Sequence, residues 1–127
     1  MMKKGKTYGL THIAIAVRDL DRTLAFYQQV FDVEVMYHQD EFLQVTTPGS
    51  NDIIVFEKKK ADYGKTGGIA HFGFRLRQAK DIDEMAERIK TAGGKIIDKG
   101  EFVPGEPYVF FKDPDGYEVE LWYELIK

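Results

Sequence analysis

The pattern of hydrophobic and polar positions along the chain occurs twice. Alternating hydrophobic residues predict a strand over residues 10–17, and hydrophobic residues at spacings of three and four predict a helix after it. Three shorter alternating segments, separated by turn residues, predict three more strands. The same order of strand, helix and three strands begins again at residue 69. The sequence therefore predicts two copies of a βαβββ unit.

Capping and turn residues bound the predicted elements. Asp19 or Asp21 can cap the first helix, and Asp32 can end it in a left-handed turn. Asp81 with Glu84 predicts a capping box at the second helix, which Gly93-Gly94 ends. Asp113-Pro114-Asp115-Gly116 predicts a type I turn with Gly116 left-handed. The remaining predicted strands are 33–38, 42–46, 52–58, 69–76, 95–98, 106–112 and 117–124.

The two units are expected to form one α+β domain. Residues 8–60 form the first module, residues 61–68 a Gly-rich linker, and residues 69–127 the second module. One helix covers one face of each sheet, so the other face must meet the sister sheet or surround a cavity. We expect a cupped mixed sheet with the helices on its outer face.

Composition and charge narrow the classes of partner. Lys and Arg number 18 against 21 Asp and Glu, and the net charge of −3 argues against a nucleic-acid-binding protein. The chain has no cysteine, which excludes disulfides, thiolate metal sites and a cysteine nucleophile. We find no signal peptide and no hydrophobic stretch long enough to span a membrane. A cytoplasmic protein without membrane or nucleic-acid partners is the expectation.

The two modules carry similar chemistry at similar places. His12 and His71 occupy equivalent positions, since both lie early in the first strand of a module. Glu57 and Glu120 are expected to be equivalent in the same way, since both lie in the last strand of a module. A pseudo-twofold axis would then bring two imidazoles and two carboxylates together.

The residues beside the histidines are small. Ala14, Ala16 and Gly73 share their strand face and would leave space there, where a packed face would be filled. Two imidazoles and two carboxylates suit one divalent metal ion, Zn²⁺, Ni²⁺, Co²⁺, Mn²⁺ or Fe²⁺. We therefore predict a metal site; the alternative for each histidine alone is a hydrogen-bonded core or surface residue.

Four segments together carry a resemblance to a known family. They are HIAIAVRDL at residues 12–20, AFY at 25–27, AHFGF at 70–74 and DPDGYEVE at 113–120. The chain resembles the vicinal oxygen chelate superfamily, which includes glyoxalases, fosfomycin- and bleomycin-resistance proteins and extradiol dioxygenases. The resemblance implies paired βαβββ modules, a homodimer, and a divalent metal held by His12, His71 and Glu120.

The resemblance also implies a reaction. Such a protein would be a lyase or isomerase that acts on a small molecule with adjacent oxygens through a metal-stabilised enolate. Glu57 and Glu120 are the candidate catalytic carboxylates, and Glu57 as fourth ligand or base would give a set similar to that of bacterial glyoxalase I. Alternatively, Glu57 begins the exposed Glu57–Lys60 segment.

Two departures from the family pattern limit the choice of substrate. Ala16 stands where glyoxalase I has an arginine that grips glutathione, which puts glutathione in doubt. Phe110 stands where extradiol dioxygenases have a tyrosine, which disfavours ring cleavage. The competing functions are a resistance-type small-molecule-binding protein of the same fold, or a dioxygenase or thiol transferase of the superfamily.

Hairpin geometry predicts the substrate side of the cup. With a bulged loop at Gly116, Phe110 pairs opposite Glu120 and Tyr108 opposite Trp122. We therefore expect Tyr108, Phe110 and Trp122 to face the cavity and to contact the substrate.

Arg75 has two possible roles. It lies on the same strand face as His71, where its guanidinium could bind a carboxylate or phosphate of the substrate. It could instead lie at the rim of the cup and pair with Glu118. The sequence does not separate these roles.

Overall fold

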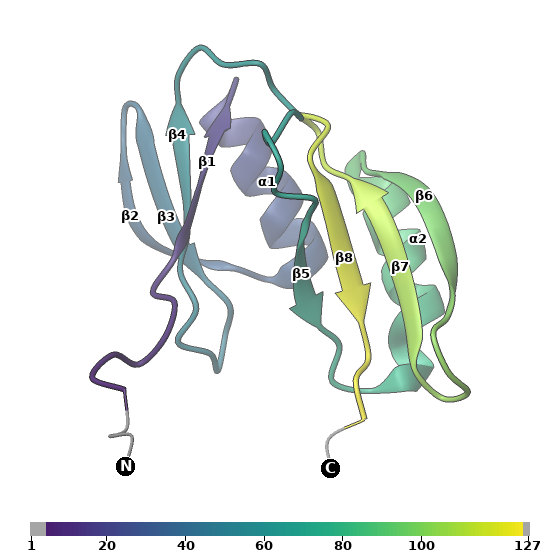
Figure 1. Cartoon of the computed structure of the whole chain (residues 1–127). Coiled ribbons are helices and arrows are strands. Elements are labelled where there is room, and N and C mark those ends of the chain that lie inside the picture. The colour runs from purple at the N-terminus through teal and green to yellow at the C-terminus, as the bar shows by residue number, and fades with distance from the viewer. Residues whose placement is uncertain (1–4, 126–127) are drawn as a thin grey trace.

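The protein, described here by a computed structural model over residues 5–125, consists of two four-stranded sheets that each pack against one helix (Figure 1). The predicted α+β fold of two βαβββ units is confirmed. The elements in chain order are β1 (Ile13–Val17), α1 (Leu20–Phe31), β2 (Glu34–Gln39), β3 (Phe42–Thr46), β4 (Ile54–Lys58), β5 (Phe72–Arg75), a 3-10 helix η1 (Ala79–Asp81), α2 (Ile82–Ala92), β6 (Lys95–Glu101), β7 (Pro107–Lys112) and β8 (Glu118–Trp122).

Both sheets have the same topology. The strand order is β1-β4-β3-β2 in the first sheet and β5-β8-β7-β6 in the second. The β1–β4 and β5–β8 pairs are parallel, and the other pairs are antiparallel. The first strand of each module is therefore an edge strand, and β1 and β5 face each other across the middle of the molecule (Figure 1).

The helix ends largely follow the sequence. The Asp19 side chain accepts a hydrogen bond from the Arg22 N–H at 3.1 Å, and Asp32 ends α1 with φ 57°. Gly93 ends α2 with φ 107°. The capping box predicted at Asp81 is wrong. The backbone of Asp81 has φ −88° and ψ 0° at the end of η1, and its side chain makes no cap, because an N-cap needs an extended backbone.

Three strand boundaries differ from the prediction by three residues, and the others by two or fewer. β1 and β5 begin at Ile13 and Phe72, so both candidate histidines lie just before their strands. β6 continues to Glu101 because its pairing with β7 extends from Lys95 to Glu101. Such pairing across the sheet lengthens a strand beyond what its own sequence indicates.

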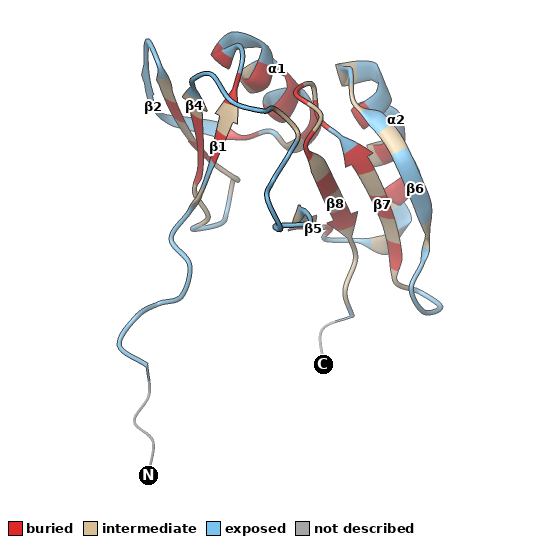
Figure 2. Ribbon diagram, turned by 45° about the horizontal axis from the view of Figure 1, so that its top comes forward, coloured by how far each residue is buried: buried red, intermediate tan, exposed pale blue. Residues whose placement is uncertain are grey.

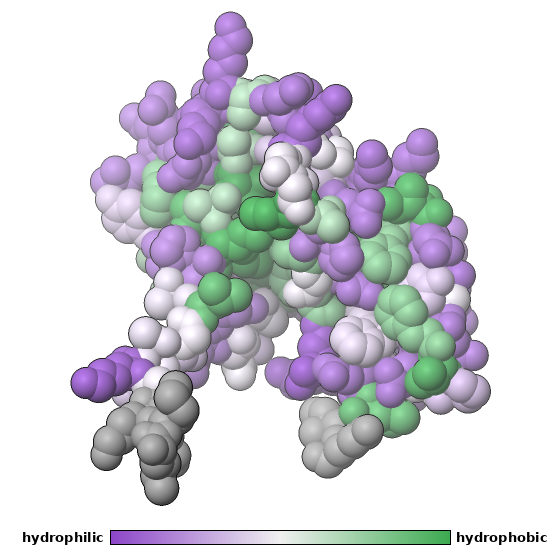
Figure 3. Space-filling view, viewed as in Figure 1, coloured by the Kyte–Doolittle hydropathy of each residue, from purple (hydrophilic) through white to green (hydrophobic). Residues whose placement is uncertain are grey.

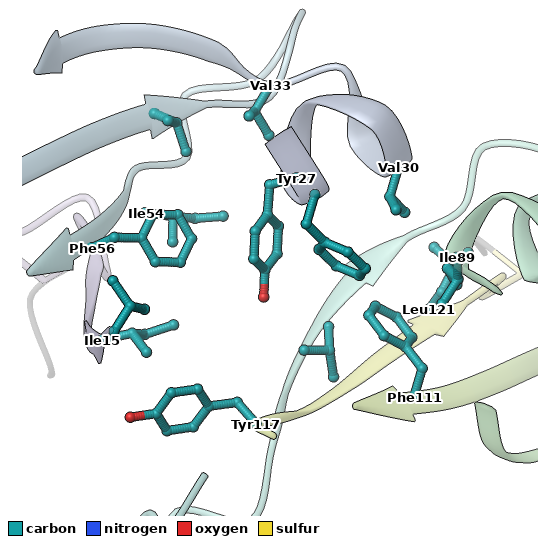
Figure 4. Packing of buried hydrophobic residues seen from close by; sticks show 14 of the residues in the cluster. Ile15, Tyr27, Val30, Val33, Ile54, Phe56, Ile89, Phe111, Tyr117 and Leu121 are labelled. Atoms are coloured by element: carbon teal, nitrogen blue, oxygen red, sulfur yellow. The ribbon is translucent and has the colours of Figure 1, made fainter. Parts of the chain in front are cut away.

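One hydrophobic core joins the two modules. Tyr27 of α1 is fully buried at its centre and lies 5.0 Å, ring to ring, from Phe56 of β4 (Figure 4). Phe31 of the same helix stacks on Phe74 of β5 at 3.8 Å. The buried residues lie between helices and sheets, while the opposite face of each sheet is more exposed (Figure 2). Helix α1 therefore fixes the second sheet relative to the first.

A buried polar cluster makes a second connection between the modules. Asp115 accepts hydrogen bonds from the Arg18 N–H at 3.2 Å and from the Arg22 guanidinium at 3.0 Å. Asp113 accepts one from the Tyr27 hydroxyl at 2.8 Å. The sequence identified these aspartates only as turn residues. The β7–β8 turn thus ties the second module to the start of α1.

The turn itself has the predicted shape. Gly116 has φ 94°, and its N–H donates to the Asp113 carbonyl at 2.9 Å. The hydroxyl of the next residue, Tyr117, donates to the Ala16 carbonyl at 2.7 Å and so reaches β1.

Replacing Asp113 with Asn is expected to change how stability depends on pH. Burial raises the pKa of the Asp113 carboxyl, while hydrogen bonds from Tyr27 and Tyr117 act in the opposite direction. The folded protein therefore binds this proton more tightly than the unfolded chain. Its stabilising contribution is complete below the ordinary pKa and is lost as pH rises through the raised pKa.

Asn does not titrate, so the unfolding free energy of the wild type relative to Asp113→Asn should fall as pH rises from about 4. Urea denaturation of both proteins over a pH series measures this difference. A difference in unfolding free energy that does not change with pH would contradict a raised pKa of Asp113 in the folded protein.

Candidate functional site

The second sheet brings an imidazole and a carboxylate together. His71 lies just before β5, and Gly73 of β5 pairs with Glu120 of β8. The His71 Nε2 lies 3.5 Å from the Glu120 Oε1, and the Glu120 side chain is 13% exposed. Both side chains lie on the open face of the sheet, opposite the face that packs on the helices.

Gly73 provides the space beside this pair. A Cβ at this position would lie 3.1 Å from the Glu120 carbonyl oxygen and 3.6 Å from its Oε1. A larger side chain would therefore press on the carboxylate or fill the space in front of it. The sequence prediction of a small residue that leaves room beside the histidine agrees with this geometry.

Burial and charge act on Glu120 in opposite directions. Desolvation raises the pKa of its carboxyl, and His71 lowers it by a smaller amount. The other ring nitrogen of His71, Nδ1, lies 3.7 Å from the Glu118 Oε2. A carboxylate near the far nitrogen is the usual way to orient a metal-binding imidazole.

The pair fits the ligand positions of a divalent metal. Two ligand atoms that are each roughly 2.0–2.2 Å from one ion lie about 3.0–3.6 Å apart. The observed separation of 3.5 Å between His71 Nε2 and Glu120 Oε1 falls within that interval. These two residues could therefore hold one ion together without moving apart.

His12 lies on the other side of the molecule's central hollow. It precedes β1, and its Nδ1 lies 2.6 Å from the Thr11 hydroxyl. It lines a cavity of about 900 Å³ together with Gly73 and Arg75, and hydrophobic surface gathers in this hollow (Figure 3). Within residues 5–125, no three His, Cys, Asp or Glu side chains converge on a common metal position. One chain thus provides the His71–Glu120 pair and a separate His12.

The proposed equivalence of Glu57 and Glu120 is wrong. The residue two positions after His71, Gly73, pairs with Glu120. The residue two positions after His12, Ala14, pairs with Val55. The counterpart of Glu120 in the first module is therefore Val55, which has no ligand atom.

Glu57 lies two residues beyond this position, opposite Ala16. Its carboxylate pairs with the Lys59 ammonium at 3.0 Å, and the side chain is 36% exposed. A two-residue offset along a strand corresponds to about 7 Å. Glu57 is therefore displaced from the place that a fourth ligand would need.

The aromatic residues pair as the hairpin geometry predicts, but Tyr108, Phe110 and Trp122 do not line the cavity of about 900 Å³. Phe110 pairs with Glu120, and Tyr108 pairs with Trp122. Phe110 also meets the His71 ring edge to face at 5.1 Å. Phe102, which the sequence did not single out, lies in the loop between β6 and β7 and stacks on Tyr108 at 4.1 Å. The available signal in the sequence was a phenylalanine close to the turn residues Pro104-Gly105.

Arg75 has a partner other than the one considered from the sequence. Its guanidinium pairs with the Glu124 carboxylate at 2.7 Å. Glu118, the partner in one of the two roles considered for Arg75, lies near His71 instead. Arg75 is thus held at the rim of the open face by a carboxylate of its own chain.

In the part of the chain that the structure describes, no helix is long and hydrophobic enough to cross a membrane.

Three comparisons with known proteins identify related proteins of the same fold. The family model of the Glyoxalase/Bleomycin resistance protein/Dioxygenase superfamily matches residues 9–121. A fosfomycin resistance protein of Listeria innocua is 30% identical, with 89% of this chain and 87% of the relative covered. A lactoylglutathione lyase of Arabidopsis thaliana is also 30% identical, with 87% of this chain covered. This chain spans only 42% of the length of that plant enzyme.

The solved structures include a close match in shape. It is a mutant of the fosfomycin resistance protein from Listeria monocytogenes, complexed with Mn(II) and 1S,2S-dihydroxypropylphosphonic acid. The two chains have a TM-score of 0.79 and 27% identity, with 94% of this chain and 93% of that chain covered.

Proposed function

Because the chain belongs to the Glyoxalase/Bleomycin resistance protein/Dioxygenase superfamily, we propose that it is a divalent-metal-dependent lyase or isomerase. Its substrate would be a small molecule with adjacent oxygens. The single observation that carries this proposal is the His71–Glu120 pair, held 3.5 Å apart beside the space that Gly73 leaves. The Mn(II) in the Listeria monocytogenes structure supports a divalent ion, whose identity the donor atoms alone do not select.

The ligands would be His71 and Glu120 from the second module and His12 from the first. Three protein ligands leave positions for substrate oxygens, as in other catalytic metal sites. When bound, the metal would supply a Lewis acid that stabilises negative charge on those oxygens. Glu120 is the carboxylate at this place and the candidate to accept or return a substrate proton. Glu57 is not a ligand in this proposal, because it lies two residues beyond the position equivalent to Glu120.

We propose that a second copy of the chain completes the site in a homodimer. His12 of one copy would face His71 and Glu120 of the other, because one chain does not bring the three together. A twofold axis makes both such sites equivalent.

Exposed hydrophobic residues support this pairing. Leu10 and Ile69 lie two residues before His12 and His71 and are 99% and 63% exposed. The neighbouring strands β1 and β5 are unpaired edges. A partner that covers these edges would also bury both side chains.

Metal removal and return tests the proposed activity. The chelated protein should be inactive, and added Zn²⁺, Ni²⁺, Co²⁺, Mn²⁺ or Fe²⁺ should restore turnover. The screen would include the hemithioacetal of methylglyoxal with several thiols, and small epoxides and diols with adjacent oxygens. Turnover that is the same in chelated and metal-loaded protein would contradict the proposal.

A second candidate function is the binding of a small molecule without chemistry. Tyr108, Phe110 and Trp122 share one open face and favour this reading. Trp122 is the only tryptophan, so its fluorescence reports on that face directly. This candidate predicts that a ligand quenches Trp122 equally well before and after chelation. A dissociation constant that rises at least about tenfold on chelation would instead favour the metal-dependent function.

A further inference from the structure

Four rings form a continuous surface on the open face of the second sheet; we call Phe102, Tyr108, Phe110 and Trp122 the aromatic wall. Phe102 stacks on Tyr108 at 4.1 Å with an interplanar angle of 19°. It meets Trp122 edge to face at 5.7 Å, and Tyr108 meets Phe110 at 5.5 Å. The separations of 5.7 Å and 5.5 Å are typical of favourable aromatic pairs.

The wall begins at the candidate metal ligands. Phe110 pairs with Glu120 and meets the His71 ring at 5.1 Å. Trp122 is two residues further along β8, on the same side as Glu120. A substrate whose oxygens lie at His71 and Glu120 would therefore place its next group against these rings.

The loop that carries Phe102 is held by its own hydrogen bonds. The Phe102 N–H donates to the Glu106 carbonyl at 3.2 Å, and the Glu106 N–H donates to the Val103 carbonyl at 3.0 Å. The Gly105 N–H donates to the Glu101 carboxylate at 3.0 Å. One face of the Phe102 ring covers Tyr108, yet the residue remains 51% exposed. The ring is thus fixed with a flat surface still open.

The charges around the wall are mostly negative. Tyr108 donates its hydroxyl to the Asp98 carboxylate at 3.0 Å, and this hydrogen bond raises the pKa of the phenol. The Arg75 guanidinium is already paired with Glu124 at 2.7 Å. An anionic group placed here would have to break that pair or approach carboxylates without compensation.

We propose that the aromatic wall selects a substrate in which an uncharged, flat aromatic group is attached next to the adjacent oxygens, with Phe102 as a specificity-determining residue. This assignment rests on the proposed function, because the His71–Glu120 end is taken as the place of the oxygens. It separates this chain from its Listeria monocytogenes neighbour, whose structure holds a dihydroxypropylphosphonic acid.

A matched series of vicinal diols tests the assignment. The compounds are 1-phenylethane-1,2-diol, 1-cyclohexylethane-1,2-diol, propane-1,2-diol and 1,2-dihydroxypropylphosphonic acid, titrated into metal-loaded protein by calorimetry. The phenyl diol should bind at least about tenfold more tightly than propanediol or the phosphonate, and more tightly than the cyclohexyl diol. Equal or tighter binding of the phosphonate would overturn the proposal, as would tighter binding of the cyclohexyl diol.

Substitution of Phe102 isolates its part. Phe102→Ala should weaken binding of the phenyl diol about 2- to 10-fold and leave propanediol unchanged, whereas Val103→Ala in the same exposed loop should change neither. Phenyl-diol binding that does not respond to Phe102→Ala would remove Phe102 from the site. Metal content is measured on every sample. A protein that binds no metal fails the proposed function, whereas a metal-loaded protein without aromatic preference fails only this inference.

Discussion

Replacing His71 with alanine is expected to lower the metal content of the purified protein from about one ion per chain to nearly none. His71 provides one of only three proposed ligands, and its imidazole is 3.5 Å from the carboxylate of another, Glu120. Loss of one ligand from a three-ligand site leaves too few donors to retain the ion through purification. Elemental analysis after dialysis against trace chelator measures the result.

His38→Ala is the matched control for this experiment. His38 is an exposed residue of β2 and is not among the proposed ligands, so its loss should leave the metal content unchanged. Far-ultraviolet circular dichroism of both variants checks that they are folded. A full complement of metal in folded His71→Ala protein would count against the site.

Asp115→Ala is expected to lower the free energy of unfolding by about 2–3 kcal/mol. Asp115 is 4% exposed, and its carboxylate accepts hydrogen bonds from the Arg18 N–H and the Arg22 guanidinium. Removal leaves the partly buried Arg18 N–H without this acceptor and opens the contact between the β7–β8 turn and α1. Both guanidinium groups are substantially exposed, so water compensates part of their loss.

Asp62→Ala is the corresponding control, because Asp62 is an exposed acid in the linker. It removes the same charge and should change the unfolding free energy by no more than about 0.5 kcal/mol. Urea unfolding followed by circular dichroism compares the two. A loss as small for Asp115→Ala as for Asp62→Ala would show that the polar cluster does not join the modules.

The fold could be predicted because its signals are local. The helices show themselves as hydrophobic stripes, and Asp19, Asp32 and Gly93 end them by their own backbone preferences. The turn at Gly116 is local in the same sense. These features recur in both halves of the chain, so each half supported the interpretation of the other.

The register between strands is not local, and the wrong equivalence of Glu57 and Glu120 follows from it. Glu57 was matched to Glu120 by its place in the last strand, but the pairing of Ala14 with Val55 decides the equivalence. Along a strand, side chains on one face repeat every two residues, so a shift of two keeps the face and moves the carboxylate. The hydrophobic pattern therefore could not reveal the error.

Contacts between distant segments were hidden for a related reason. Asp113 and Asp115 satisfy a turn on their own, so nothing in the sequence required partners on α1. Phe102 is similar, because its stacking on Tyr108 depends on how the β6–β7 loop folds back. Such residues become visible only when the sheet brings their partners to them.

The central claim is that each metal site is shared by two copies of the chain, with His12 from one and His71 and Glu120 from the other. Mixing two metal-free variants tests it most directly: His12→Ala and His71→Ala are combined, allowed to exchange subunits, and assayed for bound metal. In a shared-site homodimer, random exchange restores one intact site in each mixed dimer, so the metal content should reach about one quarter of the wild-type value. If mixed dimers form and the mixture still binds no metal, His12 and His71 of the same chain serve one site, and the account is contradicted.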